Sequence, residues 1–285
     1  MKAKLPFLAA LLAALLAAVA SLPATAASGP DVRMEPMTAD PRDVESLQRG
    51  AKLFVNYCLN CHSAKYMRYN RLVDLGLTEQ QIIDNLVLTG RFETGIDGSQ
   101  QWVPTKIGDT MQVAMPPASA KAWFGAPPPD LTVEARVRGA QWLYNYLIGF
   151  YRDPGSATGW NNLVFPNVGM PHALWDLQGV NRLVTSDYPT HEEAEGAAIA
   201  AKAIALVEPT RDHKFVVKTL EVAQPGSMSS PDYRTAVRDL VNFMDYVAEP
   251  AKFTRVRIGL VVLLFLGVLF VFAYWLKREY WKDIH

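Results

Sequence analysis

The chain has 285 residues, half of them hydrophobic, and its 28 basic and 28 acidic side chains give a formal net charge of zero. This balance, without a basic stripe, argues against a nucleic-acid partner. The chain has only two cysteines, three positions apart, which is too close to join distant parts of the fold. A chemical use for this pair is therefore predicted.

The N-terminal residues 1–26 have the three parts of a cleavable signal peptide. Lys2 and Lys4 precede an apolar run at 5–20, and the small-residue triplet Ala24-Thr25-Ala26 follows. An uncleaved N-terminal membrane helix is the alternative, but the Ala-rich run and Pro23 favour cleavage. The sequence thus predicts that the segment 27–255 is exported.

Two helices are predicted early in the exported segment. The first begins at Asp40-Pro41, an N-cap followed by proline at the first helical position, and runs straight into Cys58. Its apolar residues recur at helical spacing: Val44, Leu47, Ala51 and Phe54. In the second helix, Thr78 and Gln81 fit a capping box, and Gly90 is the predicted stop.

The middle of the chain is rich in glycine and proline, so residues 91–130 are predicted to be irregular. Thr132 is predicted to cap a third helix that reaches Phe150. Between 155 and 229 only residues 214–222 have the composition of a strand. The body is therefore predicted to be one mainly α domain with long irregular loops.

The last soluble helix is predicted to begin at Ser230 and to end at Glu249-Pro250, just before a membrane span. Residues 258–276 contain no charge, and at about 1.5 Å per residue such a helix covers a hydrocarbon core of about 30 Å. We predict an anchor at 256–276 and a cytoplasmic tail at 277–285. Basic residues flank both ends of the anchor equally, so charge does not set its orientation in the membrane. The predicted export of 27–255 sets it instead. This arrangement suits the periplasmic face of a bacterial inner membrane.

The two cysteines belong to the pentapeptide Cys58-Leu59-Asn60-Cys61-His62, the attachment pattern of c-type haem. Two thiols at this spacing can each form a thioether with one vinyl group of a porphyrin. The imidazole of His62 can then bind the iron from below. The motif predicts one covalently attached haem c, with His62 as an iron ligand. The predicted fold class is therefore a mainly α c-type cytochrome domain with long irregular loops, plus one C-terminal transmembrane helix.

Three other uses of a Cys-x-x-Cys pair compete with haem attachment. A thioredoxin-type pair would exchange disulfides, but it leaves His62 without a role. A plain disulfide does the same. A zinc site needs two further ligands. Only three histidines could supply them: His172, His191 and His213.

A methionine thioether as the sixth iron ligand would favour ferrous iron and raise the reduction potential. Met67 lies only five residues after His62, too near to reach the opposite face of a haem. Met111 is a further candidate, and His172 would give a bis-imidazole site. Met115 and Met170 both precede proline in irregular segments. Spacing alone does not choose between these two.

Five segments, taken together and in this order, resemble the cytochrome c1 family, the haem-bearing subunit of the cytochrome bc1 complex. The resemblance covers nearly the whole exported chain and is greatest to bacterial members. The segments are QRGAKLFVNYCLNCHSAKYMRYNRL at 48–72, GAPPPDLT at 125–132, WLYNYLIGFY at 142–151, NNLVFPNVGMPHAL at 161–174 and DLVNFMDYVAEP at 239–250.

The resemblance implies roles for residues beyond the pentapeptide. Met170, after the Asn…Phe-Pro pattern, is the implied sixth ligand, which leaves Met115 in a nearby loop. Arg138, or Arg136 if the alignment slips, is implied to neutralise a haem propionate. The resemblance also implies that Pro128, Pro129 and Asp130 line the haem crevice.

The same resemblance implies an electron relay within ubiquinol–cytochrome c oxidoreductase. The chain would take electrons from the Rieske iron–sulfur protein and pass them to a soluble or membrane-bound cytochrome c. It would assemble beside the cytochrome b subunit in a dimeric complex and catalyse no bond chemistry itself. A stand-alone, membrane-tethered shuttle is the alternative. Three acidic residues could steer a basic cytochrome: Glu192, Glu193 and Glu195.

Overall fold

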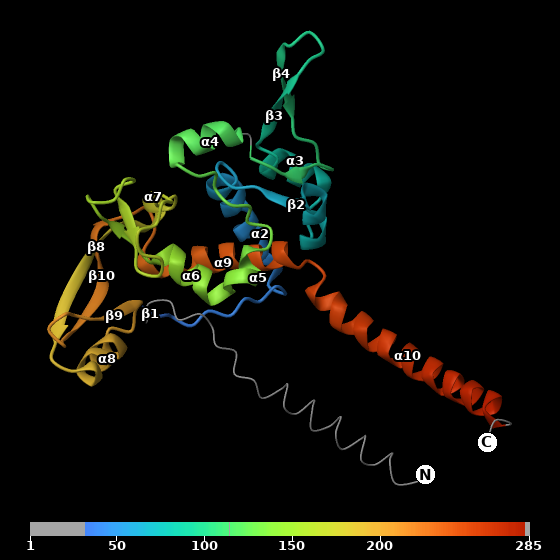
Figure 1. The fold of residues 1–285 in the computed structure, drawn as a ribbon. Coiled ribbons are helices and arrows are strands. Elements are labelled where there is room, and N and C mark those ends of the chain that lie inside the picture. The colour runs from blue at the N-terminus through green and yellow to red at the C-terminus, as the bar shows by residue number, and fades with distance from the viewer. Residues whose placement is uncertain (1–31, 114, 283–285) are drawn as a thin grey trace.

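The computed structural model describes residues 32–113 and 115–282, so the predicted signal peptide lies outside the described residues. Helices and small sheets form a head, from which one long helix, α10 (Lys252–Tyr280), projects alone (Figure 1). The head is arranged around the crossing of two helices, α2 (Val44–Leu53) and α9 (Ser230–Ala248).

The α2–α9 crossing is close because α2 presents Gly50 to the partner backbone. A Cβ at Gly50 would lie 2.1 Å from the carbonyl oxygen of Asp239. The Asp239 carboxylate accepts hydrogen bonds from the Ser46 hydroxyl and the Arg49 Nε, both at 2.6 Å. Phe54 and Phe243, fully buried, pack with ring centroids 5.5 Å apart. This crossing is the centre of the main core.

Helix α2 begins three residues later than Asp40-Pro41 predicts. Asp43 is the N-cap, and its carboxylate accepts from the backbone N–H of Ser46. Asp40 instead uses its backbone N–H to donate to Asn242 Oδ1 on α9. The helix continues into a π-helical turn, η1 (Phe54–Cys58), which confirms that one helical segment runs into Cys58.

The second predicted helix is confirmed as α3 (Glu79–Leu86). Thr78 and Gln81 form the reciprocal capping box that the sequence predicts. The helix ends at Leu86, four residues before Gly90. Between η1 and α3 lie β2 (Ala64–Arg68), which pairs with β5 (Thr110–Met111), and the 3-10 helix η2 (Tyr69–Leu75).

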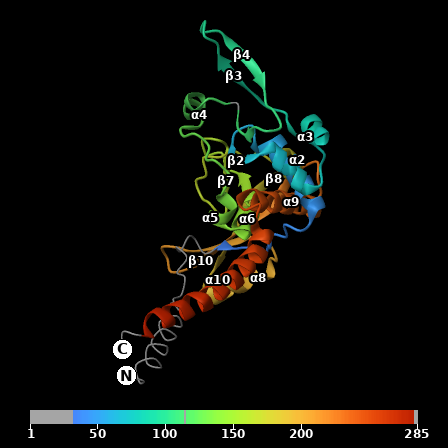
Figure 2. The same ribbon diagram turned by 90° about the vertical axis from the view of Figure 1, so that its right-hand side faces the viewer.

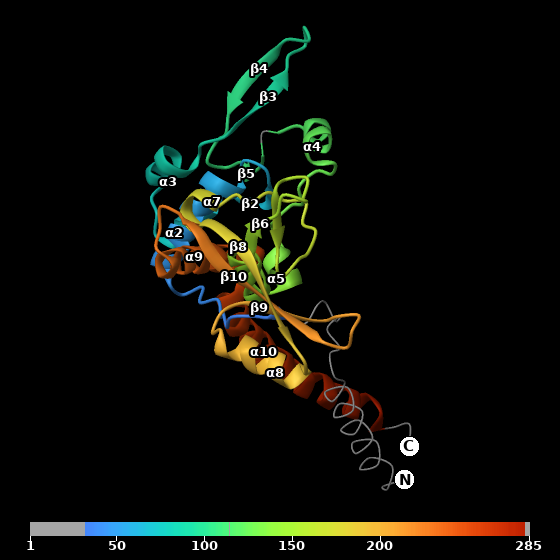
Figure 3. The ribbon, with the colours of Figure 1, turned by 90° about the vertical axis from the view of Figure 1, so that its left-hand side faces the viewer.

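The predicted irregular region 91–130 instead contains an antiparallel hairpin and a helix. The hairpin, β3 (Gly90–Thr94) with β4 (Gln100–Pro104), pairs Phe92 with Trp102, whose rings meet edge to face. Helix α4 (Pro117–Phe124) follows β5. In Figures 1, 2 and 3 the hairpin projects from the end of the head opposite to α10. A Gly-rich turn at 95–98, which suggested a loop, closes the hairpin.

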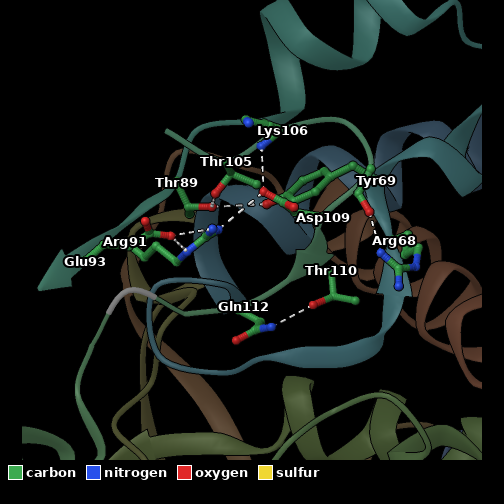
Figure 4. A network of polar contacts seen from close by, with 11 residues as sticks. Arg68, Tyr69, Thr89, Arg91, Glu93, Thr105, Lys106, Asp109, Thr110 and Gln112 are labelled. Carbon is green, nitrogen blue, oxygen red and sulfur yellow. Dashed lines mark hydrogen bonds and ion pairs between the residues drawn. The ribbon is translucent and has the colours of Figure 1, made fainter. Parts of the chain in front are cut away.

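A polar network holds the base of this hairpin (Figure 4). The Asp109 carboxylate accepts from the backbone N–H of Lys106 at 2.9 Å and from Arg91 at 3.4 Å. The Thr89 hydroxyl lies within hydrogen-bond distance of the hydroxyls of Tyr69 and Thr105. The hairpin is therefore tied to η2 and to the loop before β5.

The single helix predicted from Thr132 to Phe150 is wrong. Gly139, at φ +87°, divides it into α5 (Glu134–Arg138) and α6 (Ala140–Ile148). The Thr132 hydroxyl donates to Asp130 instead of capping a helix. Phe150 begins β6 (Phe150–Arg152), which pairs with β7 (Trp160–Asn162).

A four-stranded antiparallel sheet forms the second, smaller part of the head, in the order β1-β9-β10-β8. Its strands are β1 (Val32–Arg33), β8 (Gly179–Tyr188), β9 (Ala205–Pro209) and β10 (Phe215–Pro225). Helix α8 (His191–Ala200) packs on it, and α7 (Trp175–Gln178) precedes β8. The strand predicted at 214–222 is confirmed as β10, but its partner strands were not predicted. The mainly α class is confirmed.

The junction between α9 and α10 lies at the predicted break, Glu249-Pro250. Lys252 pairs with Asp245 at 2.8 Å, and Arg255 pairs with Glu249 at 2.5 Å. Within Thr254–Tyr280, an 18-residue window has a mean hydropathy of 2.7 and none of it is buried against the head, so α10 is long and apolar enough to span a membrane. This confirms the predicted C-terminal transmembrane helix.

Candidate haem-binding site

The Cys-x-x-Cys-His motif lies in one tight turn at the end of η1. The Cys58 carbonyl accepts from the backbone N–H of Cys61 at 3.1 Å and from that of His62 at 2.8 Å. Leu59 between them is fully buried. The π-helical turn and this bend place both thiols and the imidazole on one short segment. π-Helical turns occur frequently at functional sites.

His62 is held in one tautomer by a backbone carbonyl. Its Nδ1 lies 2.7 Å from the Pro129 oxygen, and a carbonyl only accepts, so Nδ1 carries the proton. Burial lowers the pKa of His62, and Pro129, Asp130 and Glu134 oppose that shift only in part. The ring is thus neutral, with the Nε2 lone pair left for a metal. A histidine ligand typically has such a partner on its other nitrogen.

The segment 129–132 runs along the motif and is fixed to it by three further hydrogen bonds. Asp130 accepts from the backbone N–H of Lys65, and Leu131 donates to the Ser63 carbonyl, at 2.9 and 2.8 Å. The Tyr66 N–H donates to the Thr132 hydroxyl at 3.4 Å. Pro129, for which the sequence suggested no chemistry, therefore orients His62. The Asp130-x-Thr132 pair was the available signal for an ordered turn there.

Cys58 and Cys61 are free, partly buried thiols. Burial raises the pKa of Cys58 to about 12 and also raises the pKa of Cys61. A thioredoxin-type nucleophile needs the opposite shift, toward the thiolate. The raised pKa values therefore argue against a disulfide-exchange role for this pair.

The histidines of the zinc alternative lie apart. His172 packs against Phe150 and Trp160, whereas His191 on α8 faces Glu195 and Phe215. Within residues 32–113 and 115–282, no three His, Cys, Asp or Glu side chains gather as metal ligands.

The candidate methionines differ in surroundings. Met67 and Met111 are at most 1% exposed and fill the main core. Met115 lies partly buried between β5 and α4. Met170 is partly buried beside the cluster of Phe150, Trp160 and Val168. Its Sδ lies 3.3 Å from the Tyr146 hydroxyl, which donates to it.

His172 is a buried wall of the same aromatic cluster. It is 3% exposed and stacks on Phe150, with centroids 4.7 Å apart and planes within 5°. Burial lowers its pKa to about 4. Neither its Nε2 nor the neighbouring Gln178 Oε1 has a hydrogen-bond partner in the described structure. His172 therefore packs against Phe150 and Trp160 as a neutral ring.

The two arginines proposed for a propionate diverge. Arg138 pairs with Glu134 at 3.1 Å, and its guanidinium lies 4.8 Å from the centroid of Trp142. Arg136 instead faces Glu249 at the α9–α10 junction, at 3.5 Å. Of the two, Arg138 is the one linked to Met170, through Trp142 and Tyr146.

The acidic residues proposed for steering lie on α8, which packs on β9 and β10. In Figures 1 and 3 this helix occupies the lower part of the head, whereas α2 and β2, which flank the motif, lie higher. A partner bound at Glu192, Glu193 and Glu195 would therefore be held away from the motif. The placement does not favour the steering hypothesis.

The donor set fits a covalently held c-type haem. Two free thiols at the attachment spacing stand next to a neutral imidazole whose Nε2 is available. Met170 offers a thioether from the aromatic cluster on α6, β6 and β7. Arg138 supplies a positive charge beside Trp142, which stacks on Tyr146 next to Met170. These groups come from separate elements of the fold.

Comparison with known proteins gives one family. The Cytochrome C1 family matches residues 37–284. Cytochrome c1 of Allochromatium vinosum is 44% identical, over 91% of this chain and 93% of the relative. A Nitrosomonas europaea protein named ammonia monooxygenase gamma subunit is 42% identical, over 90% and 92%. Cytochrome c1 of Rhodospirillum rubrum is 31% identical, over 85% and 83%. With a match of this length and identity, the chain belongs to the cytochrome c1 family, the haem-bearing electron carriers of the cytochrome bc1 complex.

Proposed function

We propose that the chain takes electrons from the Rieske iron–sulfur protein and delivers them to a soluble or membrane-bound cytochrome c. Cys58 and Cys61 hold one haem c covalently, and His62 and Met170 are its iron ligands. The observation that carries the proposal is the fixed imidazole of His62. Its Nδ1 donates to the Pro129 oxygen, and its Nε2 has no hydrogen-bond partner in the described part of the chain, where two unpaired thiols stand in the same motif.

Bound haem supplies a one-electron Fe(III)/Fe(II) couple. The chain's residues hold it and set its surroundings. Pro129 fixes the ring orientation of His62 and raises its basicity as a ligand. Buried Leu59 and Ala64 exclude water next to the motif. Arg138 offsets negative charge at the edge of the site. Its side chain is paired with Glu134 but is still 44% exposed.

Met170 is preferred over Met115 as the sixth ligand. Met170 lies against a packed aromatic cluster, and its Sδ faces a hydrogen-bond donor. The side chain is therefore oriented before haem is attached. Among the described residues, Met115 belongs to none of the core clusters and packs against none of them. His172 is held by Phe150 and lies beside Gln178.

The membrane arrangement follows from the two ends. Helix α10 spans the bilayer, and the N-terminal signal directs the head to the periplasmic side of a bacterial inner membrane. The ion pairs of Lys252 and Arg255 with α9 and its end fix the head to the anchor. In this position the head can contact a cytochrome b subunit and a Rieske protein within a dimeric complex.

Haem attachment is tested on the full chain purified in detergent. Denatured protein should retain a haem chromophore and the added mass, and Cys58→Ser with Cys61→Ser should lose both. A bare polypeptide mass in the unmodified chain would contradict the proposal.

The sixth ligand is tested by two matched substitutions. Met170→Leu should abolish the sulfur–iron charge-transfer band and lower the reduction potential, whereas Met115→Leu should keep the band. The opposite pattern would assign the ligand to Met115.

The partners are tested by purification through a tag on the chain. Cytochrome b and a Rieske protein should accompany it. Isolation of the chain alone would favour a free-standing shuttle. The company of monooxygenase subunits, the assembly in the name of the Nitrosomonas relative, would point to a different complex.

A further inference from the structure

Tyr146 on α6 is held rigidly between neighbouring aromatic rings. Trp142, one turn earlier, stacks on it with centroids 5.1 Å apart and planes within 9°. Phe150 meets its edge at 5.1 Å and 70°. The backbone carbonyl of Tyr146 accepts from fully buried Asn162 at 2.7 Å. Ring and backbone are therefore both fixed.

The Tyr146 hydroxyl faces one acceptor in the described part of the chain, the Sδ of Met170 at 3.3 Å. The O–H donates and the thioether sulfur accepts. Asn162 links the two residues by a second route, because its Oδ1 accepts from the N–H groups of Val164 and Phe165 at 2.9 and 3.1 Å. The segment that leads to Met170 is thus tied to α6.

A purely apolar role does not account for this hydroxyl. Phenylalanine would provide the same ring for Trp142 and Phe150, without a partly buried polar group that needs a partner. A thioether sulfur has two lone pairs, so it can bind a metal with one and accept a hydrogen bond with the other. Hydrogen bonds around a ligand sulfur tune the redox potential of its metal.

We propose that Tyr146 is a positioning residue that orients Met170 and, through its hydrogen bond to Sδ, raises the reduction potential of the site. The hydrogen bond withdraws electron density from the sulfur and makes it a weaker donor to iron. A weaker donor stabilises ferric iron less than a stronger one would, so the ferrous state is favoured and the reduction potential rises. The inference rests on the proposed role of Met170 as sixth ligand.

The test is Tyr146→Phe in the haem-loaded full chain, compared with Tyr233→Phe. Tyr233 is the matched control because its hydroxyl donates to the Leu147 carbonyl of the same helix and does not contact Met170. Redox titration and the sulfur–iron charge-transfer band are measured for both. Tyr146→Phe should keep the band and shift the ferric-to-ferrous ratio at fixed potential about threefold to tenfold toward ferric. This shift equals a fall of about 30–60 mV at 59 mV per tenfold change.

Two results would overturn the inference: a ratio changed less than about twofold in Tyr146→Phe, or an equal change in Tyr233→Phe. Met170→Leu separates this failure from failure of the ligand assignment. If the band survives in Met170→Leu, the assignment is wrong and the inference falls with it. If the band is lost there but Tyr146→Phe leaves the ratio unchanged, only the hydrogen-bond role is refuted.

Discussion

Replacement of Gly50 by alanine tests the close crossing of α2 and α9. The new Cβ would lie 2.1 Å from the Asp239 oxygen and 2.7 Å from the Phe243 Cβ, where ordinary contacts begin at 3.4 Å. The obstacle is a helix backbone, which cannot rotate away like a side-chain end. The two helices must therefore separate by about 1 Å or more, because interiors are close-packed.

The cost follows from what the separation breaks. The 2.6 Å hydrogen bond from Ser46 to the Asp239 carboxylate would exceed hydrogen-bond distance, and the packing of Phe54 on Phe243 would loosen. A bond to a charged group and an overpacked core together outweigh the helix propensity gained by alanine. We expect a net loss of about 2–5 kcal/mol in the free energy of unfolding.

The control is Gly196→Ala on α8, where a Cβ meets no heavy atom within 4 Å. It should stabilise the chain by about 0.5–1 kcal/mol through helix propensity alone. Urea unfolding of both haem-loaded variants in detergent, followed by circular dichroism, gives the comparison. Gly50→Ala should also reduce haem attachment, since α2 leads into Cys58. A difference between the variants below about 1 kcal/mol would refute the reasoning.

Three further predictions concern the surroundings of the site and the hairpin. Arg138→Gln should lower the reduction potential, because loss of a nearby positive charge favours the ferric state, whereas Arg136→Gln should leave it unchanged in redox titration. Asp130→Ala removes the acceptor of two backbone N–H groups, those of Lys65 and Thr132, and should raise amide exchange of residues 62–66 about tenfold, or about 1.4 kcal/mol. Asp130→Asn should be intermediate, and unchanged exchange would show that Asp130 does not hold the segment after His62. The pKa of Asp109 is lowered by the Lys106 N–H and then by Arg91, so its contribution to hairpin stability is complete above the unfolded pKa of about 3.9 and is lost as pH falls through the folded value. Exchange of residues 89–105, corrected for intrinsic rates, should accelerate at pH 3. Asp109→Asn should reduce that dependence, and the rest should come from Asp97, whose pKa is lowered by its hydrogen bonds from Ser99.

The sequence predicted those elements whose signals are local. The capping box of Thr78 and Gln81 needs only four consecutive residues, and α3 begins where it predicts. The apolar run of α10 depends on composition alone. The break at Glu249-Pro250 follows from the restricted backbone of proline.

Predictions failed where tertiary contacts decide between two local options. Asp40 was predicted to cap α2, but Asp43 is the cap, and the Asp40 N–H is bonded to Asn242 on α9 before the helix begins. Gly139 divides the helix predicted from Thr132, since its φ of +87° is incompatible with a continuing helix. The hairpin was missed because its turn is as rich in glycine as a loop.

In the candidate site, the sequence predicted the residues whose side chains carry the chemistry, but not the groups that orient them. Cys58, Cys61 and His62 are recognisable because their residue types and spacing carry the chemistry. The partner of His62 is a backbone carbonyl 67 positions away, and any residue has such a carbonyl. Tyr146 likewise has the spacing of an ordinary apolar helix position, and only the fold brings its hydroxyl to Met170. A sequence can therefore specify which atoms bind a cofactor, whereas the groups that orient those atoms emerge only once distant segments are packed together.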